Sequence, residues 1–340
     1  MRISKRSIIY SFIFIVAFFF VITFELPYYI YKPGHVDRLD EMIEIENGHE
    51  ATGDMHLVTI SGAQATPIQY LFAKFYTFNE IIPIEDARPE GISDEEYMQY
   101  QLQLMENSHQ ASIAVAYRAA NKEVMIEHDG VLVIDVIKNM PADGILEIGD
   151  QIIQVDERNI QKAEELVDYV ETKQAGETIT LVIDRDGERM NKSLTVMSFP
   201  ESDEKVGIGI RLVTNQRVTV DPPAQIKSGS IGGPSAGLMF ALEIYNQLTE
   251  MDISKGYHIA GTGEIDFDGN VHRIGGIDKK VVAAHRQGME IFFAPNEEGN
   301  PDSNYHVAKE TVEQINSTMK VVPVDTFQDA LSYLEQLEPK

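Results

Sequence analysis

A single serine lies within a run of small residues that is typical of a nucleophile loop: Gly232-Gly233-Pro234-Ser235-Ala236-Gly237. Glycine and alanine leave the neighbouring backbone N–H groups uncovered, which a site needs when a serine attacks a carbonyl and an oxyanion develops. Helical spacing of apolar residues begins directly after this serine, so a helix N-terminus adds further N–H groups and a favourable dipole. We therefore predict Ser235 as the nucleophile, with the N–H groups of Gly233, Ser235 and Ala236 as donors.

A serine hydroxyl needs a base to take its proton, and Lys280 is the candidate downstream. Around it, Ile277, Val281 and Ala284 recur at helical spacing and share one apolar face. Lys280 falls at the edge of this face, whereas Lys279 points the opposite way. Burial disfavours the ammonium form, so a lysine in this place can be neutral near pH 7 and act as a general base. An exposed lysine whose stem covers apolar surface fits the same pattern.

These motifs resemble the proteolytic domain of the Lon protease family, from about Val206 to Leu337. They follow one another in the family's order: Gly233-Pro234-Ser235-Ala236-Gly237, Gly261-Thr262-Gly263-Glu264-Ile265, Ile274-Gly275-Gly276 and Lys280. The family uses a Ser–Lys dyad, so the resemblance implies Ser235 as nucleophile and Lys280 as base, with Thr262 positioning the lysine. One position departs from the pattern: family members with an ATPase usually carry an acidic residue where this chain has Gly232.

The same run also satisfies G-x-S-x-G, the nucleophile elbow of α/β-hydrolases. Candidate partners follow in the right order, with Asp266 or Asp268 before His272 or His285. The elbow requires a hydrophobic strand directly before the serine, whereas residues 225–231 are polar and rich in glycine and serine. A hydrolase triad therefore remains the less favoured alternative.

Residues 108–199 resemble a PDZ domain of the kind found in bacterial proteases. A strand at 130–136, a turn at 140–144, a second strand and a helix at 163–172 carry the resemblance. PDZ domains bind an extended peptide as an added strand at a sheet edge. If the domain is ordered like those of other bacterial proteases, the groove is lined by Ser112, Ile113, Ala114 and Val115, although core packing explains these residues equally well.

The N-terminal region has the pattern of a membrane anchor. Residues 7–24 contain no charged side chain and follow Arg2, Lys5 and Arg6. A transmembrane helix needs about 20 such residues, and tyrosines at 28, 29 and 31 would form an aromatic belt at its far end. A cleaved signal peptide is less favoured, because no small-residue cleavage site follows. We expect a cytoplasmic tail at 1–7, an anchor at 8–31 and an extracytoplasmic connecting region at 32–107.

The overall composition limits the possible functions. With 28 basic and 54 acidic residues, the net charge of −26 argues against binding nucleic acid through its phosphates. The absence of cysteine excludes thiol catalysis and cysteine-based zinc sites, and the chain has no H-E-x-x-H zinc motif. No G-x-x-x-x-G-K-[ST] loop is present, so we expect no ATP-driven unfolding, no metal and no cofactor.

These observations predict an α+β multidomain chain with an N-terminal transmembrane helix. A PDZ-like β domain follows at 108–200, and a Lon-type α/β protease domain at 201–340. The resemblance extends to the membrane-anchored Lon-like PDZ proteases of Gram-positive bacteria. It implies an ATP-independent serine endopeptidase outside the cytoplasmic membrane that cleaves peptides or small membrane proteins, such as peptide signals or division inhibitors, and that often forms rings. The alternative from another class is an inactive PDZ adaptor that only binds peptides.

Overall fold

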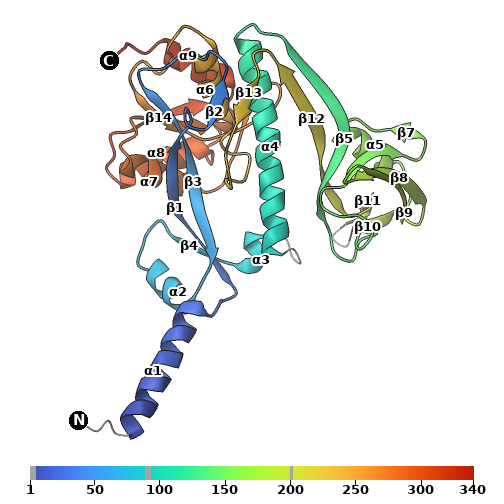
Figure 1. The fold of residues 1–340 in the computed structure, drawn as a ribbon, viewed down its shortest axis with the longest axis horizontal. Coiled ribbons are helices and arrows are strands. Elements are labelled where there is room, and N and C mark those ends of the chain that lie inside the picture. Colours follow the sequence, from blue (N-terminus) through green and yellow to red (C-terminus); the bar gives the residue numbers. More distant parts are fainter. Residues whose placement is uncertain (1–4, 89–92, 200–201) are drawn as a thin grey trace.

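A computed structural model describes residues 5–88, 93–199 and 202–340 (Figure 1). The first four residues of the predicted tail, and residues 200–201 at the predicted domain boundary, lie outside these ranges. The chain forms a body built on a mixed sheet, a smaller β domain carried on a long two-stranded ribbon, and an N-terminal helix that projects from the body.

The main sheet has six strands in the order β18-β17-β14-β3-β1-β4. Its strands come from both ends of the chain: β1 (Tyr28–Arg38), β3 (Asp54–Gln64), β4 (Glu80–Pro83), β14 (His258–Gly261), β17 (Ile291–Pro295) and β18 (Lys320–Val324). Strand β14 runs parallel to both β3 and β17, whereas β1 is antiparallel to β3 and β4. The predicted connecting region at 32–107 is therefore part of the body's central sheet.

The β domain is inserted between β4 and β14. Its elements are β5 (Val124–Val136), β6 (Gln151–Val155), β7 (Arg158–Asn159), α5 (Ala163–Glu171), β8 (Thr178–Arg185), β9 (Glu188–Thr195), β10 (Met197–Phe199), β11 (Ser202–Gly207) and β12 (Ile210–Val220). The sheet order is β12-β5-β6-β8-β9. The long strands β5 and β12 pair along their whole length and form the ribbon (Figure 1). Strand β12, predicted as part of the protease domain, completes this second sheet.

Helices cover both faces of the main sheet. Helices α4 (Asp94–Ala119), α6 (Gly237–Leu248) and α9 (Phe327–Glu335) share one apolar core with one face. Helices α7 (Ile277–Arg286) and α8 (Asn304–Gln314) form the core on the other face. Strand β17 shows the alternation behind this arrangement, since Ile291 and Phe293 enter the first core and Phe292 and Ala294 the second.

Short elements complete the body. They are α2 (Pro67–Ala73), α3 (Ile84–Ala87), η1 (Glu297–Gly299), the pair β2 (Ile43–Ile45) with β13 (Ala224–Ile226), and the pair β15 (Glu264–Ile265) with β16 (Val271–His272).

The N-terminal helix α1 (Lys5–Thr23) differs from the predicted transmembrane span of 8–31. It ends at Thr23, and Tyr28, Tyr29 and Tyr31, predicted as an aromatic belt, lie in β1. Within the parts of the chain that the structure describes, no helix is both long enough and apolar enough to cross a membrane. The predicted transmembrane helix is thus not supported.

Candidate active site

The structure brings Ser235 and Lys280 together. Lys280 lies in the first turn of α7, whose N-cap Gly276 has a left-handed backbone (φ 67°) that favours glycine. The lysine Nζ lies 2.7 Å from Ser235 Oγ and 2.9 Å from Thr262 Oγ1. Only 3% of Lys280 is exposed, and this burial lowers its pKa to about 7. Ser235 is partly exposed, so the pair lies at the edge of the core.

Thr262 connects the two residues of the pair. Its hydroxyl accepts a hydrogen bond from Lys280 and donates one of 2.8 Å to the carbonyl oxygen of Ser235. The threonine follows β14, and its N–H donates to the carbonyl of Phe293 in β17 (3.0 Å). The N–H of Gly263 also donates to the Ser235 carbonyl (2.8 Å). The central sheet therefore fixes both the lysine amine and the backbone of the serine.

The backbone around Ser235 supplies free donors, but not all those predicted. Ala236 is the N-cap of α6, and among the described residues the N–H groups of Ser235 and Ala236 have no acceptor. They lie at a helix N-terminus, where an oxyanion is stabilised. In contrast, the N–H of Gly233 donates to the carbonyl of Gln101 (2.8 Å) in α4. The prediction of Gly233 as a donor is thus wrong for this conformation, because α4 already occupies that N–H group.

Helix α4 holds the nucleophile loop at two further points. The hydroxyl of Ser108 donates to the carbonyl of Pro234 (3.0 Å), and that of Ser112 donates to the carbonyl of Gly237 (2.8 Å). A capping box between Ser93 and Glu96 begins this helix, which runs on to a turn that leads directly into β5. We use the name α4 clasp for the three hydrogen bonds by which Gln101, Ser108 and Ser112 of α4 hold the nucleophile loop.

The predicted peptide groove is wrong, because its residues lie in α4. Ser112, Ile113, Ala114 and Val115 are all buried in α4 and do not lie at a sheet edge. Small residues here allow α4 to pack closely on α6, so this stretch belongs to the body's core. The end strand of the PDZ-type sheet is instead β12, with α5 beside it: the N–H of Ala163 donates to Thr214 Oγ1 (3.0 Å). The sequence predicts a strand-like stretch at 206–220, but it does not predict that this stretch pairs with β5.

The same helix explains the glycine that departs from the Lon pattern. A Cβ added to Gly232 would lie 2.6 Å from Cβ of Gln101, too close for any side chain. Gln101 of α4 therefore occupies the space in which a side chain at this position would begin.

The geometry does not assemble the alternative hydrolase triad. Asp266 does pair with His272 (3.0 Å), but its carboxylate also accepts from the N–H groups of Asp268 and Asn270 and so organises a turn. Within residues 5–88, 93–199 and 202–340, no histidine hydrogen-bonds to Ser235, whose hydroxyl is instead bonded to Lys280. Nor does a long strand precede the serine, since β13 has only three residues.

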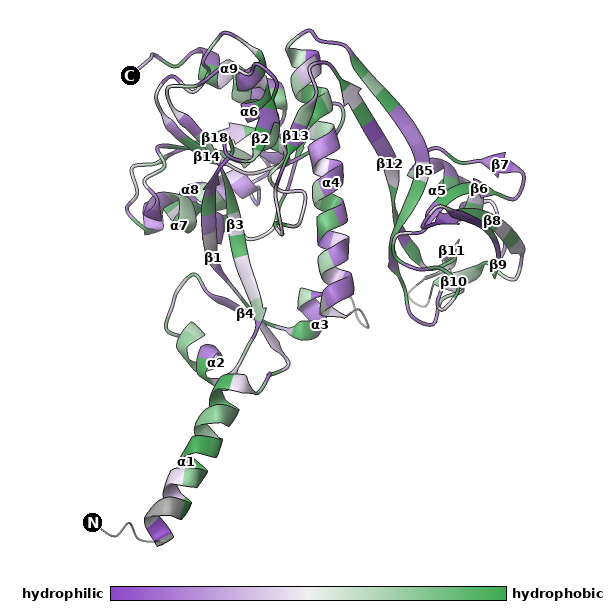
Figure 2. Ribbon diagram, in the orientation of Figure 1, coloured by the Kyte–Doolittle hydropathy of each residue, from purple (hydrophilic) through white to green (hydrophobic). Residues whose placement is uncertain are grey.

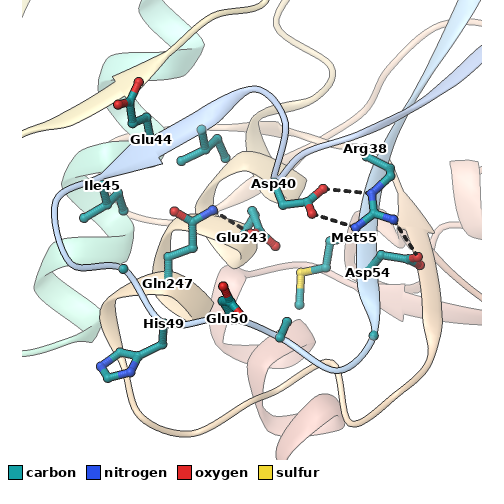
Figure 3. Close-up of a pocket in the computed structure, with 14 residues that line it drawn as sticks. Arg38, Asp40, Glu44, Ile45, His49, Glu50, Asp54, Met55, Glu243 and Gln247 are labelled. Carbon is teal, nitrogen blue, oxygen red and sulfur yellow. Dashed lines mark hydrogen bonds and ion pairs between the residues drawn. The ribbon is translucent and has the colours of Figure 1, made fainter.

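A separate cavity of about 450 Å³ lies at the other end of α6 (Figure 3). Glu243 is buried in its wall and accepts a hydrogen bond from Gln247 Nε2 (2.7 Å). Burial raises the pKa of Glu243 to about 7. On the opposite side, Arg38 forms ion pairs with Asp40 and Asp54. Within the described structure, none of the residues that line this cavity belongs to the Ser–Lys pair.

Comparison with known proteins supports both resemblances. A family model described as the Lon protease (S16) C-terminal proteolytic domain matches residues 172–336, and a PDZ domain model matches residues 105–196. The Lon protease of Aster yellows witches'-broom phytoplasma (strain AYWB) is 30% identical over 149 residues, covering 43% of this chain and 17% of that protein. Lon protease 1 of Myxococcus xanthus is 32% identical over 149 residues, with the same coverage of 43% and 17%.

A solved structure of the PDZ domain of an SdrC-like protein from Listeria monocytogenes is 28% identical, covers 25% of this chain and 88% of its own, and has a TM-score of 0.24. The chain spans about 17% of the length of the two Lon proteases, and strands β1 and β3 lie outside both matched ranges. The predicted resemblance is confirmed at the level of domains: the chain contains a serine-peptidase domain of the Lon type and a PDZ domain.

Proposed function

We propose that this protein is an ATP-independent endopeptidase in which Ser235 and Lys280 form the catalytic dyad. The observation that carries the proposal is the amine of a buried lysine at 2.7 Å from the hydroxyl of a partly exposed serine. An inactive PDZ adaptor would not need such a pair, because burying an amine lowers stability and a chain that only binds peptides gains nothing from it in return. ATP independence follows from the lack of any phosphate-binding loop motif in the sequence.

The reaction proceeds from the neutral form of Lys280. The lysine takes the proton of Ser235 as Oγ attacks the substrate carbonyl, and the N–H groups of Ser235 and Ala236 bind the oxyanion. Lys280 then gives its proton to the leaving amine, which produces an acyl-enzyme. Water then attacks the acyl carbon while Lys280 takes its proton, and Lys280 returns that proton to Ser235 Oγ as the bond between the acyl carbon and Oγ breaks, which releases the acid and restores the dyad.

We further propose that substrates are peptides or small membrane proteins outside the cytoplasm. Without an unfolding motor, the dyad can act only on flexible or unfolded segments. The PDZ domain would recruit them as an added strand beside β12, the end strand of its sheet. Attachment to the membrane would come from α1, whose large apolar side chains are exposed. Figure 2 shows that most of this helix is hydrophobic.

The test uses the full chain on a fluorescently labelled unfolded protein without ATP. Ser235→Ala and Lys280→Ala should each remove cleavage while leaving the circular dichroism spectrum unchanged. Lys309→Ala, which changes an exposed lysine of α8, is the matched control and should keep full activity. Substantial cleavage by the Lys280 variant would exclude the dyad, and no cleavage by the folded wild-type chain would favour the adaptor.

A further inference from the structure

Exposed apolar side chains gather at one place besides α1. Leu71, Phe72, Phe75 and Tyr76 have exposed fractions of 58%, 56%, 76% and 62%. The other large apolar residues exposed on the described surface outside α1 and its end at Phe24 are single and scattered, as is usual for a folded protein: Met98, Met125, Val167, Met197 and Met251. We call residues 71–78, which lie in and directly after α2, the aromatic loop. Four neighbouring exposed apolar residues indicate a binding surface.

The aromatic loop is held in a defined orientation. A capping box between Thr66 and Gln69 begins α2, and Pro67 occupies its first turn. On the inner side, Ala73 is buried with Ile30 and Ala65 in a small apolar cluster. The exposed aromatic side chains therefore belong to a fixed element whose other face is packed on the main sheet.

Basic residues accompany the aromatic loop although the chain as a whole is acidic. Lys32 and Arg286 line the same open hollow as Phe75, Tyr76 and Phe78, and Lys74 lies in the loop itself, over the ring of Tyr70. The nearest acidic residue in the sequence, Glu80, is already paired with Lys279 (2.8 Å). Aromatic and basic side chains together match the interface of an anionic bilayer.

The aromatic loop also lies next to the proposed anchor. Helices α1 and α2 contact each other, and Figure 2 shows apolar residues on both. The segment after α1 is tied to the start of α2, since the N–H of Leu26 donates to the carbonyl of Ala65 (2.8 Å) and Gln64 Nε2 donates to the carbonyl of Leu26 (3.0 Å). The loop thus has a fixed position relative to the end of α1.

We propose that the aromatic loop inserts into the headgroup region of an anionic lipid bilayer beside α1. The proposal extends the membrane attachment that is part of the proposed function. Bilayer contacts made by both α1 and the aromatic loop would prevent the body from rotating about the axis of α1. They would hold the Ser–Lys site at a fixed height above the lipid, so that cleavage is restricted to substrate segments within that distance of the membrane.

The experiment uses single-tryptophan variants of the full chain, since the native sequence contains no tryptophan. Phe75→Trp reports on the aromatic loop, Phe14→Trp on α1, and Met251→Trp on an exposed apolar position outside both. Each variant is mixed with vesicles of equimolar phosphatidylglycerol and phosphatidylcholine, with acyl chains brominated at a shallow or a deep position. We expect a blue shift and shallow-label quenching for Phe75→Trp, deep-label quenching for Phe14→Trp, and neither for Met251→Trp.

The outcomes separate this proposal from the membrane attachment itself. If Trp fluorescence is quenched for Phe14→Trp but not for Phe75→Trp, the loop contact is wrong and the anchor stands. Quenching of Phe75→Trp alone would support the loop contact and exclude α1 as the anchor. A concentration-dependent blue shift of Phe75→Trp without vesicles would mean that a second copy covers the loop, which overturns the proposal. As a second readout, Phe72→Ser with Phe75→Ser should weaken vesicle binding by roughly tenfold.

Discussion

The amine of Lys280 and the hydroxyl of Ser235 lie 2.7 Å apart although 45 positions separate the two residues in the chain. The hydrogen-bond partners of the amine are two hydroxyl groups, and burial alone lowers its pKa to about 7. The pKa of the amine is therefore lowered by exclusion of water rather than by a neighbouring charge.

The pH dependence of cleavage follows from this pKa. Only neutral Lys280 can accept the serine proton, so kcat/KM should rise with pH through about 7 and then level off. A rate that rises only near the pKa of free lysine, about 10.4, would mean that the amine is hydrated in solution. The measurement is a profile of kcat/KM between mildly acidic and alkaline pH, with circular dichroism at each point to exclude unfolding.

Thr262 should act as a positioning residue. Thr262→Val keeps the shape of the side chain but removes the hydroxyl that bonds to both Lys280 and the Ser235 carbonyl. We expect kcat to fall by about 10² while KM changes little, because orientation of the base contributes mainly to the transition state. Thr262→Ser retains the hydroxyl and should recover most of the activity. Equal losses in both variants would show that packing of the methyl group, rather than the hydroxyl, is what matters.

The α4 clasp should be needed for activity more than for stability. Ser112→Ala removes the hydrogen bond to the carbonyl of Gly237, which costs about 1 kcal/mol of unfolding free energy. Because this bond holds the turn that carries Ser235, kcat should fall by about tenfold. Gln99→Ala, at an exposed position of the same helix, is the control. Urea unfolding and initial rates of both variants provide the comparison, and unchanged rates in Ser112→Ala would limit the clasp to packing.

Glu243 should make stability fall as pH rises. Burial raises its pKa from 4.5 to about 7, so between these values the folded state holds a proton that the unfolded state has lost. The unfolding free energy should decrease by about 3 kcal/mol across this window, and the contribution of Glu243 should stay level above it. Glu243→Gln should flatten this part of the curve, whereas Glu250→Gln, at an exposed position, should not. A wild-type curve that rises over the window would contradict the raised pKa.

The sequence predicted the dyad because the chemistry requires particular residues. Ser235 needs small neighbours, and Lys280 interrupts an apolar helical face, so both leave a local pattern. The α4 clasp leaves no local pattern in the sequence, because Ser108 and Pro234 lie 126 positions apart and serine is common on helices. The peptide groove is predicted in the wrong place for a related reason. A run of alanine, serine and valine is compatible with a strand at a sheet edge and equally with a helix in a close contact. The pairing of β5 with β12 places β12, and not residues 112–115, at one end of the sheet.

The insertion of the PDZ domain into the main sheet has a consequence for biosynthesis. During synthesis, strand β3 cannot pair with β14 until β14 has been made. The paired residues Asp54 and His258 lie 204 positions apart in the chain. At about 5–20 residues per second, a ribosome needs roughly 10–40 s to make that stretch. Lys280 emerges later still, after both Ser235 and the PDZ domain. The newly made chain therefore lacks a complete Ser–Lys pair for as long as β3 lacks its partner strand in the main sheet.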